Sequence, residues 1–149
     1  MPNWCSGKLK VRGEVSNLKR FILEGLKPVG WDGETGESLR EDKYGDIHYE
    51  GTCWICGTHR GFVEDIDIYL SGLEYGGTIC LDSRFAWGIS TEQLQAVCQK
   101  YRVDMKIYAF EKGMQFNQDI EIVDGRIVTD KEIKFSDYLW ECIDPERGG

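Results

Sequence analysis

Two cysteines and a histidine that lie close together in the sequence are the residues best suited to bind a metal. Cys53 and Cys56 form a Cys-x-x-Cys pair, and His59 follows three residues later. Thiolates and imidazoles are preferred zinc ligands, so these side chains could supply three of the four ligands of a tetrahedral site. Cys80 or Cys5 could supply the fourth. In an extended strand, Cys53 and Cys56 would face opposite sides, so buried thiols without metal are the competing interpretation.

The two histidines, His48 and His59, are the side chains that could act as a general base near neutral pH. A serine or cysteine nucleophile would need one of them, held in place by a third group such as Asp46, Asp65 or Asp67. No serine stands in the glycine-flanked turn that exposes such a nucleophile. The sequence therefore favours a protein that is not an enzyme, and we predict no catalytic residues.

Carboxylates alternate along two predicted strands. Asp65 and Asp67 share one side of the first strand. Asp119 and Glu121 share one side of the second, and Asp82 lies on a third segment. If these strands are neighbours, the cluster could bind Mg²⁺ or Ca²⁺, act as acid and base, or resemble phosphates to a basic partner. A solvated sheet face is the alternative, since polar residues belong there.

The charge of the chain is acidic and unevenly distributed. The formal net charge is −8, and residues 41–149 carry twenty-one acidic against eleven basic residues. Five acids and no bases lie between positions 61 and 83, namely Glu64, Asp65, Asp67, Glu74 and Asp82. A nucleic-acid-binding surface usually has the opposite sign, because Lys and Arg neutralise phosphates. These acids predict an acidic face that binds a basic partner protein, and solubility alone is the alternative.

A glycine-rich segment at 25–45 is the best candidate for a mobile loop, with five glycines among scattered charges. Its cations and its aromatic side chain are Lys27, Trp31, Arg40 and Lys43. With a short basic stripe on the N-terminal strand (Lys8, Lys10 and Arg12), they could contact nucleic acid by charge and stacking. A nucleic-acid-binding module of this kind is the second hypothesis for function.

The hydrophobic pattern indicates which elements would position these side chains. Residues 8–12 alternate polar and apolar, which predicts a half-buried strand. Apolar residues recur at helical spacing over 18–26, and Ser90 with Gln93 forms a capping box that opens a second predicted helix. Further strands are predicted at 47–55 (with a bulge at Gly51), 66–70, 79–81 and 105–110, and on both sides of an Asp124-Gly125 hairpin turn.

The order strand–helix–strand–strand–helix–strand predicts one ferredoxin-like domain over 1–149. This is an α+β sandwich in which an antiparallel sheet carries two helices on one face. The C-terminal tail at 136–149 is expected to pack back on the sheet. No stretch is long and apolar enough to span a bilayer, and no signal peptide is evident, so we expect a cytoplasmic location, no membrane contact and reduced cysteines.

Four short segments stand out for their order along the chain: 1–5 (MPNWC), 57–59 (GTH), 85–87 (FAW) and 111–116 (EKGMQF). In this order they resemble the YubB-type ferredoxin-like family of phages, plasmids and other bacterial mobile elements. The resemblance covers nearly the whole chain. It implies the same ferredoxin-like fold and an accessory protein of a mobile element, and it implies no established reaction.

The leading hypothesis follows from this resemblance together with the acidic charge. Small acidic proteins of mobile elements often block host defence or regulatory proteins, some by imitating nucleic acid. We therefore expect a protein that binds a host protein, such as a defence nuclease of the CRISPR effector type, through the acids at 64–82. A zinc-binding domain or enzyme around Cys53, Cys56 and His59 is the further alternative, and otherwise no cofactor is expected.

Overall fold

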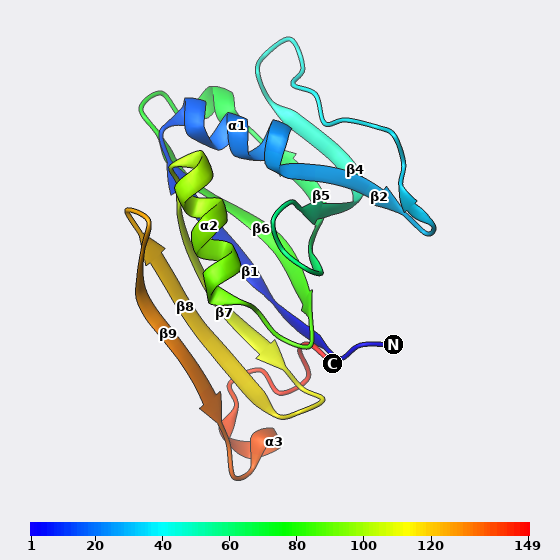
Figure 1. The fold of residues 1–149 in the computed structure, drawn as a ribbon, viewed down its shortest axis with the longest axis vertical. Coiled ribbons are helices and arrows are strands. Elements are labelled where there is room, and N and C mark those ends of the chain that lie inside the picture. Colours follow the sequence, from blue (N-terminus) through cyan, green and yellow to red (C-terminus); the bar gives the residue numbers. More distant parts are fainter.

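Nine strands form one antiparallel sheet in the computed structural model, which describes residues 1–149 (Figure 1). The strands are β1 (Trp4–Gly13), β2 (Leu26–Gly30), β3 (Gly33–Glu34), β4 (Ile47–Ile55), β5 (Gly61–Ile68), β6 (Gly77–Ala86), β7 (Asp104–Glu111), β8 (Phe116–Val123) and β9 (Arg126–Lys134). Their order across the sheet is β3-β2-β4-β5-β6-β1-β7-β8-β9. The first strand of the chain therefore lies near the centre of the sheet.

Two helices pack against one face of the sheet. These are α1 (Val15–Gly25) and α2 (Thr91–Tyr101), which lie together in front of the strands in Figure 1. The rings of Phe21 and Tyr101 join them edge to face, with centroids 5.8 Å apart. A 3-10 turn, η1 (Leu70–Gly72), follows β5, and a short helix, α3 (Tyr138–Glu141), lies in the C-terminal tail. None of these helices combines the length and the apolar character needed to cross a bilayer.

The predicted ferredoxin-like sandwich is wrong. The structure is dominated by a nine-stranded antiparallel sheet with three short helices. The sheet extends beyond the predicted unit because β2 pairs with β4, with Leu26 opposite Ile55, and because β8 and β9 continue it on the other side of β7. Each added strand satisfies its backbone groups by pairing with the one before it, so the hairpins become part of one sheet.

Alternation along β1 defines the two faces of the sheet. Cys5, Leu9 and Val11 are fully buried beneath the helices, whereas Lys8 and Lys10 between them are exposed on the other side. Side chains of successive strand residues point to opposite faces, so this pattern continues across the paired strands. We call the face opposite α1 and α2 the open face.

The C-terminal tail crosses one end of the open face. Phe110, Tyr138 and Cys142 form a second small apolar cluster there, separate from the main core. The Tyr138 hydroxyl donates a hydrogen bond to Asn117 Oδ1 at 2.8 Å. The backbone N–H of Gly149 reaches the carbonyl oxygen of Trp4 at 2.8 Å, which brings the two ends of the chain together (Figure 1).

Candidate functional site

The five acids predicted to form one binding face are found in three different surroundings. Glu64 and Asp82 lie directly opposite each other on β5 and β6, on the open face. Each carboxylate is bound by a cation: Glu64 by Arg84 at 3.0 Å and Asp82 by Lys8 at 2.7 Å. Their charge is therefore balanced locally, and neither side chain presents an unmatched carboxylate to a partner.

Asp65 holds a bulge in the sheet. The register of β4 and β5 shifts between Tyr49 and Thr52, around Gly51, whose φ of 135° suits glycine. The bulge predicted at this glycine is confirmed. The Asp65 carboxylate accepts a hydrogen bond from the Gly51 N–H at 2.8 Å. Asp65 itself has a φ of 47°, in the left-handed region of backbone conformations. Its role is therefore structural, whether or not it also contacts a partner.

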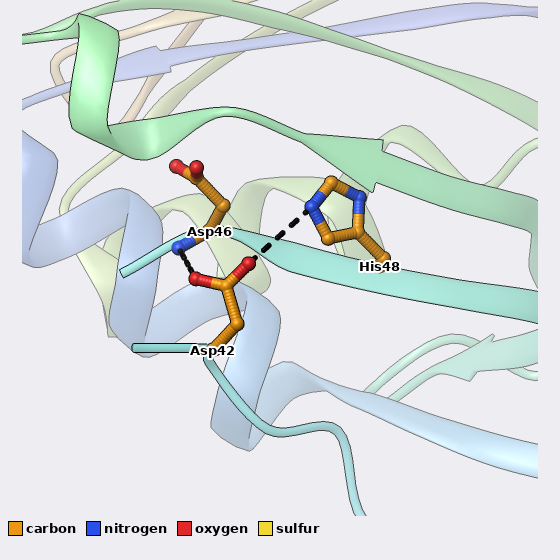
Figure 2. Close-up of side chains that lie close together, drawn as sticks. All are labelled: Asp42, Asp46 and His48. Atoms are coloured by element: carbon orange, nitrogen blue, oxygen red, sulfur yellow. Dashed lines mark hydrogen bonds and ion pairs between the residues drawn. The ribbon is translucent and has the colours of Figure 1, made fainter. Parts of the chain in front are cut away.

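His48 lies between two carboxylates at the end of β4. Its Nδ1 contacts Asp67 across the β4–β5 pair, and its Nε2 lies 3.6 Å from Asp42 Oδ2. The ring also packs edge to face on Tyr69, with centroids 5.1 Å apart. Figure 2 shows the Asp42 carboxylate between the His48 ring and the backbone N–H of Asp46, which donates to it at 3.0 Å.

Asp42, Asp46 and His48 are the one group of three metal-ligating side chains with ligand atoms within 4.8 Å of one another. The Asp46 carboxylate, however, points away from the ring in Figure 2 and accepts hydrogen bonds from the Ser71 N–H at 2.9 Å and the Ser71 hydroxyl at 3.1 Å. The Ser71 N–H, the largest influence, lowers the pKa of Asp46. These bonds tie η1 to the start of β4, which is a structural role.

Three tyrosines are exposed at this end of the sheet. Tyr44, Tyr69 and Tyr75 have 67%, 61% and 92% of their surface exposed. The Tyr44 N–H donates to Asp42 at 2.8 Å, and Tyr75 lies with exposed Glu74 in the loop between η1 and β6. We call this surface the acid–tyrosine end; it consists of Asp42, Tyr44, Asp67, Tyr69, Glu74 and Tyr75. These tyrosines could not be identified from the sequence, because their exposure depends on the loop conformations.

The cations predicted to bind nucleic acid do not lie together. Lys27 is on β2, and Trp31, Arg40 and Lys43 are exposed at the β3–β2 edge or in the segment that leads to β4. The N-terminal stripe lies on β1, and β4, β5 and β6 separate β2 from it. A single surface built from the 25–45 segment and the N-terminal strand is therefore absent.

The predicted zinc ligands Cys53, Cys56 and His59 do not bring their ligand atoms together as one group of three. Cys53 is buried, and its burial, with the charge of Glu64 adding to the effect, raises the pKa of its thiol to about 12. Burial also raises the pKa of Cys56. His59 is exposed, and its backbone N–H donates to Gln93 Oε1 at 2.9 Å. Zinc binds thiolates, so a raised thiol pKa weakens such a site.

The predicted carboxylate pairs stay separate because their strands are not neighbours. Asp65 and Asp67 are on β5, whereas Asp119 and Glu121 are on β8, with β6, β1 and β7 between them. Glu121 is bound by Lys106 at 2.9 Å. The acids therefore do not form one cluster for a divalent cation or for acid–base chemistry.

The four segments that carry the family resemblance meet at the end of the sheet near Trp4. The Trp87 N–H donates to the Asn3 carbonyl at 2.8 Å, and the Ala86 N–H donates to the Arg60 carbonyl at 3.1 Å. Gly113 lies against the Asn3 side chain. Comparison of the chain with protein-family models, with curated proteins and with solved structures found no match. Membership of the YubB-type family stays a prediction.

Proposed function

We propose that this protein is a non-catalytic interaction protein that binds a partner protein with a basic surface through its acid–tyrosine end. The observation that carries the proposal is that Asp67 and Glu74 lie at the same end of the sheet as three exposed tyrosines. Tyrosine is enriched at protein interfaces, because its ring buries a large area and its hydroxyl still forms hydrogen bonds. Carboxylates around such rings suit a partner rich in Lys and Arg.

Several contacts hold the Asp42, Asp67 and Tyr69 part of the acid–tyrosine end in one conformation before a partner arrives. Asp42 accepts hydrogen bonds from the N–H groups of Tyr44 and Asp46, and Asp46 in turn holds Ser71. His48 is packed between Asp67 and Tyr69. A surface that is ordered in advance loses less conformational entropy on binding, which supports a role in recognition.

The class of partner follows from the charge and from the family resemblance. A surface that presents carboxylates can compete with phosphates for a basic cleft, and nucleases have such clefts. We therefore propose a host nucleic-acid-binding protein as the target, with a defence nuclease of the CRISPR effector type as the first candidate. A mobile element in a bacterial cell is the proposed context.

The proposal is tested by affinity capture from bacterial lysate followed by mass spectrometry, with a pair of variants. Glu74→Lys and Tyr75→Ala change side chains that form no ion pair or side-chain hydrogen bond in the structure. Both variants should lose the captured basic protein, and raised salt should weaken its capture by the wild type. Glu132→Lys, an exposed charge reversal on β9, serves as the matched control. A partner retained equally by all four proteins would refute the proposal.

A further inference from the structure

A row of cations follows the centre of the open face. Lys8, Lys10 and Arg12 project from alternate positions of β1. Lys106 on β7 lies directly opposite Lys10 in the strand register, and Arg147 reaches the same area from the tail. Three segments that are far apart in the sequence thus bring positive charge to one place, although the chain as a whole is acidic.

Four of these cations, Lys8, Lys10, Lys106 and Arg147, line a groove of about 190 Å³. Ile107, Tyr108 and Phe110 complete its walls. We call it the basic groove. Lys10 is exposed and forms no ion pair within 4.0 Å, so its charge is available to a ligand. The row ends at Arg12, because Asp104 binds that guanidinium at 2.9 Å.

An aromatic side chain in the basic groove is oriented for stacking. Tyr108 is 38% exposed. Its ring packs edge to face on Phe110 with centroids 5.3 Å apart, and its hydroxyl accepts a hydrogen bond from Asn117 Nδ2 at 3.1 Å. The Trp4 ring at the start of β1 already lies against the Arg84 and Arg60 guanidinium groups, 4.6 Å and 5.8 Å from its centroid, so Tyr108 is the ring offered to a base. Fixed rings beside cations are the elements of a surface for unpaired bases.

The acids of the open face flank this row and are largely on other strands. Asp82 is on β6, and Asp119 and Glu121 are on β8. The strands β6 and β8 are three spacings apart, roughly 14 Å at the usual distance between strands. The phosphate backbone of one strand fits between these acids. A wider polyanion such as duplex DNA would contact the acids and be repelled by them. The ion pairs Lys8–Asp82, Lys106–Glu121 and Arg147–Asp144 are at least partly exposed to solvent, and pairs of this kind contribute little to stability.

We infer that the open face binds single-stranded nucleic acid along β1. Phosphates contact Lys10, Lys106 and Arg147, and a base stacks on Tyr108. This site shares no residue with the acid–tyrosine end, so it stands or falls independently of the proposed partner protein. It also excludes the 25–45 segment, since that segment lies at the far edge of the sheet.

The test measures fluorescence anisotropy of a labelled single strand of about ten nucleotides, as DNA and as RNA, titrated with the full chain. Binding should weaken as salt rises, with a slope of about −0.7 for each phosphate contact. Lys10→Glu should lower the affinity about tenfold or more, and Tyr108→Ala about tenfold, because a stacked base is lost. Tyr108→Phe, which keeps the ring, should bind within about twofold of the wild type.

Lys43→Glu is the matched control, because it makes the same charge reversal in the 25–45 segment and should leave the affinity unchanged. Thermal melting establishes that each variant is folded. The inference is overturned if no binding occurs at low salt, or if Lys10→Glu binds as well as the wild type. It is also overturned if Tyr108→Ala leaves the affinity for the single strand unchanged, because the face would then attract any polyanion by charge alone. Equally tight binding of duplex DNA and of the single strand would overturn it as well.

Discussion

The Nζ atom of Lys8 lies 2.7 Å from Asp82 Oδ1, across the pairing of β1 with β6. The sequence predicts that Lys8 belongs to a basic stripe and Asp82 to an acidic face. Their contact shows that the centre of the open face is a mixed surface in which the acid reduces the charge of the base. Substitution of Asp82 therefore distinguishes nucleic-acid binding on the open face from binding of a partner protein at the acid–tyrosine end.

Asp82→Asn should strengthen the binding of single-stranded nucleic acid several-fold, because it removes a negative charge beside the basic groove and frees Lys8, which lines that groove, from its ion pair. The same change should leave capture of the basic partner protein unaltered, since Asp82 lies outside the acid–tyrosine end. Anisotropy and affinity capture on one preparation measure both effects. If Asp82→Asn instead abolished capture of the partner, the partner would bind the acidic face that the sequence predicts over 64–82, and not the acid–tyrosine end.

The six cysteines should differ sharply in reactivity. Cys80 is exposed on β6, whereas burial raises the pKa values of Cys5, Cys53 and Cys98 to about 12. Brief treatment of the native protein with iodoacetamide at neutral pH should therefore modify Cys80 first, and the buried thiols only after unfolding. Mass spectrometry of the digested protein identifies the labelled sites. Faster labelling of Cys53 after treatment with a chelator would point to bound metal and revive the zinc alternative.

Stability should fall in acid partly through Asp46. Its pKa is lowered in the folded state, chiefly by the Ser71 N–H, so the carboxylate stabilises the protein above the unfolded-state pKa of about 4. That contribution is lost as the pH falls through the lower folded-state value. The difference in unfolding free energy between the wild type and Asp46→Asn should therefore narrow from pH 6 to about pH 3 in urea titrations. Asp32→Asn, in an exposed turn, should show no such convergence.

Thr58 should be important for stability through its hydroxyl. The side chain is buried, donates to the Ile55 carbonyl at 2.6 Å and accepts from the Gly61 N–H at 3.1 Å. Thr58→Val keeps the shape and leaves the Gly61 N–H without its partner, at a cost of about 1–3 kcal/mol. Chemical denaturation measures the loss. Thr58→Ser retains the hydroxyl and should cost clearly less; an equal cost would show that the methyl group, and not the hydrogen bonds, carries the effect.

The tail should loosen when Tyr138 loses its hydroxyl. Tyr138→Phe keeps the ring against Phe110 but removes the hydrogen bond to Asn117 Oδ1, which should cost about 1 kcal/mol. Tyr138→Ala also removes the ring and should cost about 3–5 kcal/mol. Limited proteolysis should then cut the tail faster in the same order. Trp140→Ala is the control, because that ring is 86% exposed and its loss should leave proteolysis unchanged.

Local elements of the fold were predictable where the signal lies within a few residues. The alternation over 8–12 falls within β1, and the Ser90 cap is confirmed, since its side chain accepts from the Gln93 N–H at 3.3 Å. The Asp124-Gly125 turn joins β8 and β9 with both residues at positive φ. Each of these features depends on backbone geometry that neighbouring residues determine.

The arrangement of strands was not predictable in the same way. Lys8 and Asp82 are brought together only by the order of the strands, and nothing near either residue encodes that order. β2 escaped prediction because Leu26 to Gly30 is short, contains Pro28 and lies in a glycine-rich stretch. Exposure of Tyr69 and Tyr108 likewise depends on which elements cover them. The candidate sites could therefore be predicted as residue types, but not as surfaces.

The central position of β1 also constrains how the chain reaches its native state. β1 is synthesised well before both of its neighbours, which lie at Gly77–Ala86 and Asp104–Glu111. Until those segments leave the ribosome, Leu9 and Val11 have no sheet to join. High contact order of this kind slows folding and prolongs the lifetime of aggregation-prone chains. Refolding should accordingly be limited by closure of these long loops.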